Sequence, residues 1–238
     1  MVKELKGSLV YLFSNLRFSL IVFWSILIAV LLISIVTSII LEDSHVSFNM
    51  SAPVYFFTGV FGFWMVKNGI PFLIKMGATR KAIFIASGIF GIVLSLLNAI
   101  ISNTIIKIVS IIYKSGGING ALSIYINGNE QQINHISQFL GHDSIFSRIT
   151  IDSTISFFLF CGFFFSGLIF YKYGVVGGIS FSVLVFLFII YAGNVGWLET
   201  LFIYLFSDFG VTFFYQMFAV GIVFYLLSFL LLRRLTIR

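Results

Sequence analysis

Three histidines and one acid–serine pair are the side chains best suited to metal or hydrolytic chemistry. His45, His135 and His142 follow one another at intervals of 90 and 7 residues, which matches no zinc-ligand pattern. His142, Asp143 and Ser144 have the residue types of a hydrolytic triad, but triad groups converge from separate positions, so three adjacent residues do not form one. The sequence therefore predicts no metal site and no catalytic residue, and we interpret these side chains as solvated loop residues.

The commonest motifs for nucleotide binding, zinc binding, serine hydrolysis and redox chemistry are absent from the sequence. It has no G-x-x-x-x-G-K-[ST] phosphate-binding loop, no H-E-x-x-H, no G-x-S-x-G and no C-x-x-C. Any ATP-driven step would need a separate subunit. The long apolar stretches hold few ionisable residues apart from Lys107, whereas proton-coupled carriers place such residues within the membrane. An intramembrane enzyme and a proton-coupled carrier are therefore disfavoured.

The elements that would position any site are apolar and long. Hydrophobic residues make up 60% of the chain and charged residues 9%, against about 25% in soluble domains. At a rise of about 1.5 Å per residue, about 20 residues cross the hydrocarbon core. The sequence predicts an all-α membrane protein, a single transmembrane domain over residues 1–238, with six spanning helices. These lie at residues 18–41, 47–66, 82–106, 154–170, 174–191 and 211–232.

The charges fall on alternate sides of these stretches. One side carries most of the 14 Lys and Arg residues, and the other carries all of the 8 Asp and Glu residues except Glu4. Lys and Arg in short loops resist translocation, so this pattern predicts a multi-pass protein of the cytoplasmic membrane with both termini in the cytoplasm. It also accounts for the net charge of +6 without nucleic acid, since the cations are scattered at helix ends.

Three segments outside the spans have expected structures of their own. Residues 1–17 place Leu5, Leu9, Leu12, Phe13 and Leu16 on one helical face, which predicts an amphipathic helix in the headgroup plane. Residues 113–153 are expected to form an external loop, with room for a short hairpin across Asn127–Gly128. Residues 193–210 are too short to cross twice and are expected to be re-entrant or interfacial.

A small-residue stripe occurs at the start of the fifth predicted span. Gly174, Gly178 and Ser182 recur every four residues, a pattern that lets two helix backbones approach closely. Ordinary use of glycine in turns and membranes is the alternative interpretation.

The cytoplasmic loop after the second predicted span carries the most informative motif. Gly69 and Pro71 are expected to break the spanning helix, and Pro71 suits the first position of a new, short helix. The string Met76-Gly77-Ala78-Thr79-Arg80-Lys81 follows, immediately before the third span. Taken alone, it could be a helix cap at Thr79 followed by the basic residues of the cytoplasmic side.

This motif resembles the corresponding loop of bacterial type-2 ABC exporter permeases, in which an apolar run precedes Gly-small-Thr/Ser-Arg-Lys and the third helix. The resemblance extends to the amphipathic start, the six spans and the re-entrant stretch before the last span. It implies a coupling helix that docks on a separate ABC ATPase subunit, which would hold the ATP and Mg. The residues it implies for docking are Pro71, Phe72, Leu73, Lys75, Met76, Gly77, Thr79, Arg80 and Lys81.

The same resemblance implies a second permease copy, identical or paralogous, with the first, second and fifth helices at the seam. A path lined by the chain's apolar residues, 31 of them Phe, would suit export of a hydrophobic or amphipathic substrate, such as a peptide, an antibiotic or a lipid. The chain itself would then be a transport subunit and no enzyme, with no cofactor of its own. A non-transporting immunity or assembly protein on the same scaffold is the alternative, and it predicts that residues 71–81 are dispensable.

Overall fold

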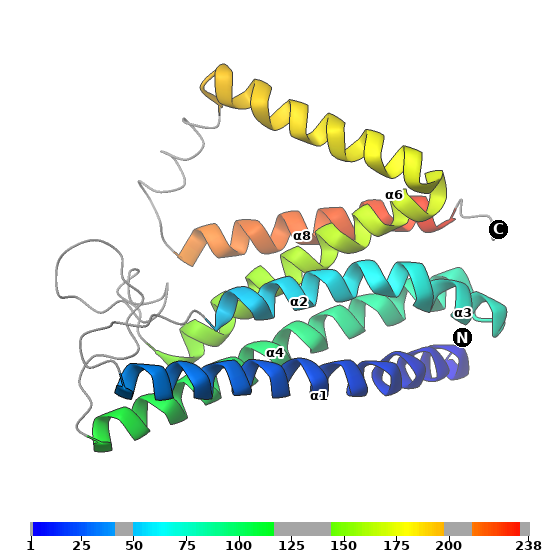
Figure 1. Ribbon diagram of the computed structural model, residues 1–238. Coiled ribbons are helices and arrows are strands. Elements are labelled where there is room, and N and C mark those ends of the chain that lie inside the picture. Colours follow the sequence, from blue (N-terminus) through cyan, green and yellow to red (C-terminus); the bar gives the residue numbers. More distant parts are fainter. Residues whose placement is uncertain (1, 41–49, 117–143, 198–210, 234–238) are drawn as a thin grey trace.

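The computed structural model describes residues 2–40, 50–116, 144–197 and 211–233 (Figure 1). Their regular structure is entirely helical, with no strand among these residues. The elements in chain order are α1 (Val2–Ile40), α2 (Ser51–Trp64), the π-helical turn η1 (Met65–Gly69), α3 (Ile70–Lys75), α4 (Arg80–Gly116), α6 (Ile145–Asn194) and α8 (Val211–Arg233). The described part of the chain therefore confirms the all-α class.

Five helical stretches are long and apolar enough to cross a membrane, which is consistent with a membrane protein. The longest, α6, covers both the fourth and the fifth predicted spans. Its backbone leaves helical geometry at Gly174, with φ 73° and ψ −174°, a region that residues with a Cβ essentially avoid. Figure 1 shows the two arms of α6 diverging from this point, with the second arm directed away from the other helices.

The remaining helices pack into a bundle around aromatic side chains. Phe90, Phe160 and Phe164 are fully buried at its centre, and glycines bring the helices together around them. A Cβ on Gly62 would lie 2.6 Å from the Phe160 carbonyl oxygen, and one on Gly91 would overlap the Phe160 ring. Helices α2 and α4 therefore approach the first arm of α6 more closely than any larger residue allows.

The predicted boundary between an interfacial helix and the first span is not present. Helix α1 runs without interruption through Arg17, and its apolar stripe packs against the bundle. Leu12 and Leu16 are each 1% exposed, and Phe13 contacts Phe90 of α4. An amphipathic pattern does not reveal whether lipid or protein covers its apolar face, so it does not distinguish a helix in the headgroup plane from one packed on the bundle.

The predicted break at Gly69 and Pro71 is also not present. The helix continues from α2 through η1 and α3 and ends only at Lys75. In η1 the Ile70 N–H bonds the Met65 carbonyl, one residue farther back than in an α-helix. This wider turn directly before Pro71 gives room to the proline ring, which in a regular helix clashes with the preceding turn.

Helix α6 begins earlier than predicted, at Ile145 instead of residue 154. Ser144 caps it, because its side-chain oxygen accepts a hydrogen bond from the Ser147 N–H at 3.1 Å. Helix α4 likewise extends to Gly116, so the segment between these helices is shorter than the predicted external loop of residues 113–153. The suggested hairpin within that loop and residues 198–210 of the predicted re-entrant segment (193–210) lie outside the described residues.

Candidate functional site at the α3–α4 corner

The turn between α3 and α4, which we call the α3–α4 corner (residues 75–81), has a defined backbone. Gly77 has φ 84°, and its N–H bonds the Ile74 carbonyl at 2.9 Å. The Ala78 N–H bonds the Leu73 carbonyl at 3.0 Å. These two bonds form a Schellman motif, in which glycine takes the left-handed position and the last carbonyls of the helix are satisfied. Gly77 thus ends α3 and sets the direction of the corner.

Thr79 joins the corner to both α4 and α1. Its hydroxyl oxygen accepts a hydrogen bond from the Ala82 N–H at 3.4 Å, in the manner of a helix N-cap. The same hydroxyl donates to Glu4 Oε2 at 2.8 Å, and the Thr79 N–H approaches that oxygen at 3.3 Å. Both hydrogen bonds favour the charged carboxylate and lower the pKa of Glu4. Glu4 lies level with the corner, outside the apolar stretch of α1 predicted to span.

Arg80 joins the corner to the end of the last helix. Its guanidinium donates a hydrogen bond to the main-chain carbonyl of Arg233, the final residue of α8. The first helix, the corner and the last helix therefore meet at one end of the bundle, where α3 and the N-terminus lie together in Figure 1. A force applied to the corner would reach α1 through Glu4 and α8 through Arg80.

The predicted docking residues divide into an outward and an inward set. Met76 is 69% exposed and Phe72 is 41% exposed, the latter with its ring stacked on Tyr11 at 4.3 Å between centroids. The other exposed members of the predicted set are Lys75, Gly77, Thr79, Arg80 and Lys81, and Pro71 is half-buried. Leu73 is 2% exposed and belongs to the bundle core, so the expectation that it fills a partner's groove is wrong.

The predicted small-residue stripe does not bring a second helix of the described chain close. Gly174 makes the kink, and a Cβ there would meet nothing within 4 Å. Gly178 packs under the Phe170 ring, which lies on the other side of that kink in the same element. The Ser182 hydroxyl donates to the Gly178 carbonyl at 3.1 Å. These residues therefore shape the bend of α6.

A buried polar cluster, which the sequence analysis missed, lies among α2, α4 and α6. The Asp152 carboxylate is 2% exposed and accepts hydrogen bonds from the Tyr55 hydroxyl and, at 2.6 Å, from the Asn103 amide. One turn away, the Asn98 amide donates to Thr58 Oγ1 at 3.0 Å. Asp152 falls in the predicted external loop of residues 113–153, but the structure places it inside α6 as a buried carboxylate.

The described residues contain no group of three or more His, Cys, Asp or Glu side chains that could hold a metal ion. The three histidines lie outside them. The chemistry that the corner offers is recognition by exposed apolar and cationic side chains.

Comparison of the chain with models of known protein families finds no match, and comparisons with curated proteins and with solved structures find none either.

Proposed function

We propose that this chain is the membrane-spanning permease subunit of an ATP-driven exporter of the ABC type. Its α3–α4 corner would bind a separate ATPase subunit, and its substrate would be hydrophobic or amphipathic. The resemblance of the Met76–Lys81 string supplies the family, and one structural observation carries the proposal. Exposed Met76, Lys75 and Lys81 project from a corner that is hydrogen-bonded to both α1 and α8.

This arrangement suits the transmission of a partner's motion. Exposed apolar side chains supply affinity at an interface, whereas surrounding charges set orientation and favour an acidic partner surface. The core position of Leu73 holds the corner rigidly on the bundle, so that a displacement of the corner moves helices rather than a loose loop. We assign the docking role to Phe72, Met76 and the cations, and a supporting role to Leu73.

The kink at Gly174 supports six crossings. If each arm of α6 crosses the membrane once, the five long helical stretches become six spans, and both termini lie on the side of the α3–α4 corner. The second arm exposes apolar side chains around most of its circumference, including Val176 at 80% and Leu184 at 66%. Such a surface is compatible with lipid and with the second permease copy that the resemblance implies.

Affinity purification with matched variants tests the docking role. The full chain is purified from its host in mild detergent as wild type, Met76→Asp and Lys81→Glu, and co-purified ATPase is quantified by mass spectrometry. Phe146→Asp and Lys107→Glu are the matched controls, because both residues are exposed and lie near the opposite end of the bundle. We expect a stoichiometric ATPase with wild type and both controls, and at least a tenfold loss with each corner variant.

Two results would count against the proposal. Absence of any ATPase from a well-folded wild-type preparation would favour the immunity or assembly alternative. Equal recovery of the ATPase with corner variants and controls would place the interface elsewhere on the chain.

A further inference from the structure

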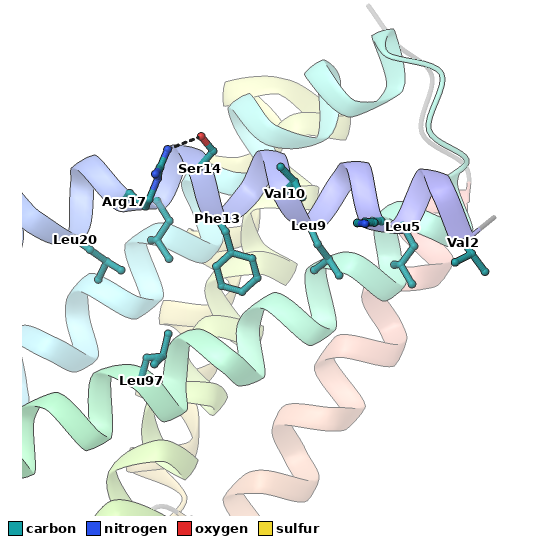
Figure 2. A pocket seen from close by; sticks show the side chains of 11 residues that line it. Val2, Leu5, Leu9, Val10, Phe13, Ser14, Arg17, Leu20 and Leu97 are labelled. Atoms are coloured by element: carbon teal, nitrogen blue, oxygen red, sulfur yellow. Dashed lines mark hydrogen bonds between the residues drawn. The ribbon is translucent and has the colours of Figure 1, made fainter.

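An apolar groove with two cations runs along the first half of α1, beside α4 (Figure 2). Its volume is about 760 Å³. The lining residues are Val2, Leu5, Lys6, Leu9, Val10, Phe13, Ser14, Leu16, Arg17, Leu20 and Leu97. Figure 2 shows Leu5, Leu9, Phe13 and Leu20 pointing toward α4, with Arg17 and Ser14 joined on the neighbouring face of α1. This lining contains no Asp or Glu, so its formal charge is positive.

The two cations share one face of α1 at different depths. Lys6 and Arg17 are eleven residues apart, which is close to three helical turns and about 16 Å along the axis. Helices α1 and α4 run in parallel, since Glu4 meets Thr79 and Phe13 meets Phe90 farther along. Arg17 therefore lies well beyond the level of the α3–α4 corner, toward the middle of the bundle.

Arg17 is an exposed cation on an otherwise apolar surface. Its Nη2 donates to the Ser14 hydroxyl at 3.3 Å, which uses one of five N–H donors. Leu20 and Leu97 lie beyond it, and Val10 and Phe13 lie before it. Ionisable groups at membrane depth are costly unless they pair with an opposite charge or reach the interface. The side chain of a helical residue leans toward the helix N-terminus, which directs Arg17 toward the end of the bundle that carries the α3–α4 corner.

We propose that this groove binds an anionic glycerophospholipid of the surrounding bilayer. The phosphate pairs with the Arg17 guanidinium and the Ser14 hydroxyl, Lys6 adds attraction from the headgroup side, and acyl chain covers the deeper Leu20 and Leu97. Basic pockets between membrane helices are known to select anionic headgroups by this combination of charge and apolar contact.

Thermal unfolding in nanodiscs tests the proposal, with Cys161 as an internal reporter. This thiol is 0% exposed and becomes reactive to a maleimide dye only when the bundle opens. The full chain is compared in phosphatidylcholine alone and with added phosphatidylglycerol of the same acyl chains. We expect phosphatidylglycerol to raise the midpoint for wild type, because a ligand of the folded state shifts unfolding. Lys6→Gln and Arg17→Gln should each reduce this shift at least by half, and the double variant should abolish it.

Three further variants separate the groove from general effects of charge and folding. Lys107→Gln removes an exposed cation at the other end of α4 and should keep the full shift. Leu97→Trp fills the groove at constant charge and should reduce the shift. Arg17→Lys should retain part of it. No shift for wild type, or an equal reduction with Lys107→Gln, would overturn the proposal. The proposal would also fail if Arg17→Gln lowered the unfolding midpoint in phosphatidylcholine alone by as much as it reduces the phosphatidylglycerol shift. That result would indicate a purely structural role for Arg17.

Discussion

Thr79 donates a hydrogen bond to Glu4 across 75 residues of sequence, with 2.8 Å between the hydroxyl and carboxylate oxygens. The first turn of α1 is thereby fixed to the residue that caps α4. Both partners are exposed, so water competes for the contact and salt weakens it. The contact is most valuable as a positional constraint, because it sets where the N-terminus lies relative to the α3–α4 corner.

Glu4→Gln should make the corner less stable at neutral pH and indistinguishable from wild type in acid. The pKa of Glu4 is lowered in the folded protein, so its stabilising contribution is present above the unfolded pKa and is lost as pH falls through the folded pKa. The difference in thermal midpoint between wild type and Glu4→Gln is measured from neutral pH down through the folded pKa of Glu4. In a Thr79→Val background, which removes the hydroxyl donor and keeps the Thr79 N–H, the difference between Glu4→Gln and its parent should shrink, and a difference of unchanged size would assign the effect to another partner.

Asn103→Leu should destabilise the bundle by about 1–3 kcal/mol, because it leaves a buried carboxylate oxygen of Asp152 without its amide donor. Thr104→Val is the matched control, since Thr104 is exposed on the next position of α4 and bonds only within its own helix. Denaturant titration of both variants in detergent gives the comparison. Equal losses of unfolding free energy in Asn103→Leu and Thr104→Val would mean that the hydrogen bond to Asp152 contributes nothing to stability.

Gly174→Ala should cost about 1–3 kcal/mol, because the required φ and ψ lie in a region available essentially to glycine. Gly162→Ala, in the regular part of the same helix with no atom within 4 Å of the added Cβ, should be neutral or slightly stabilising. The difference in thermal midpoint between the two variants is the measurement. A neutral Gly174→Ala would indicate that α6 is straight at this residue in solution.

Gly91→Ala should be rescued by a smaller partner at position 160. The added Cβ overlaps the Phe160 ring, which is fully buried and cannot move aside without opening the core. Phe160→Leu alone creates a cavity, and the two changes together should cost less than the sum of their separate effects. A double-mutant cycle of unfolding free energies measures this coupling. Simple additivity would contradict direct contact between α4 and α6 at this level.

The sequence predicts correctly those helices whose ends are determined by nearby residues of the same helix. The last span, expected at residues 211–232, matches α8, and the third, expected to begin at residue 82, begins at Arg80. Apolar length and flanking cations are properties of one helix, so they can be read without knowing the neighbours. The exposed cations of the corner were predicted for the same reason.

The errors arose where a neighbouring element decides the outcome. Pro71 would break a regular helix, but the π-turn that ends at Gly69 accommodates it. The stripe of α1 suits lipid as well as protein, and the bundle covers Leu12 and Leu16 within it. Asp152 stands beside turn-forming sequence and was placed in a loop, although Tyr55 and Asn103 supply the donors that allow its burial. In each case the favourable interaction comes from residues distant in sequence.

The π-turn at Met65–Gly69 determines which side chains are exposed at the α3–α4 corner. One π-turn adds a single residue to an otherwise α-helical rod, and each residue rotates the following helix by about 100°. Deleting one residue there would turn α3 by that angle relative to α2, which would swing Leu73 out of the core and turn Met76 away from its present direction. Which side chains form the proposed docking surface therefore depends on helical phase, which one inserted residue in the middle of a helix sets.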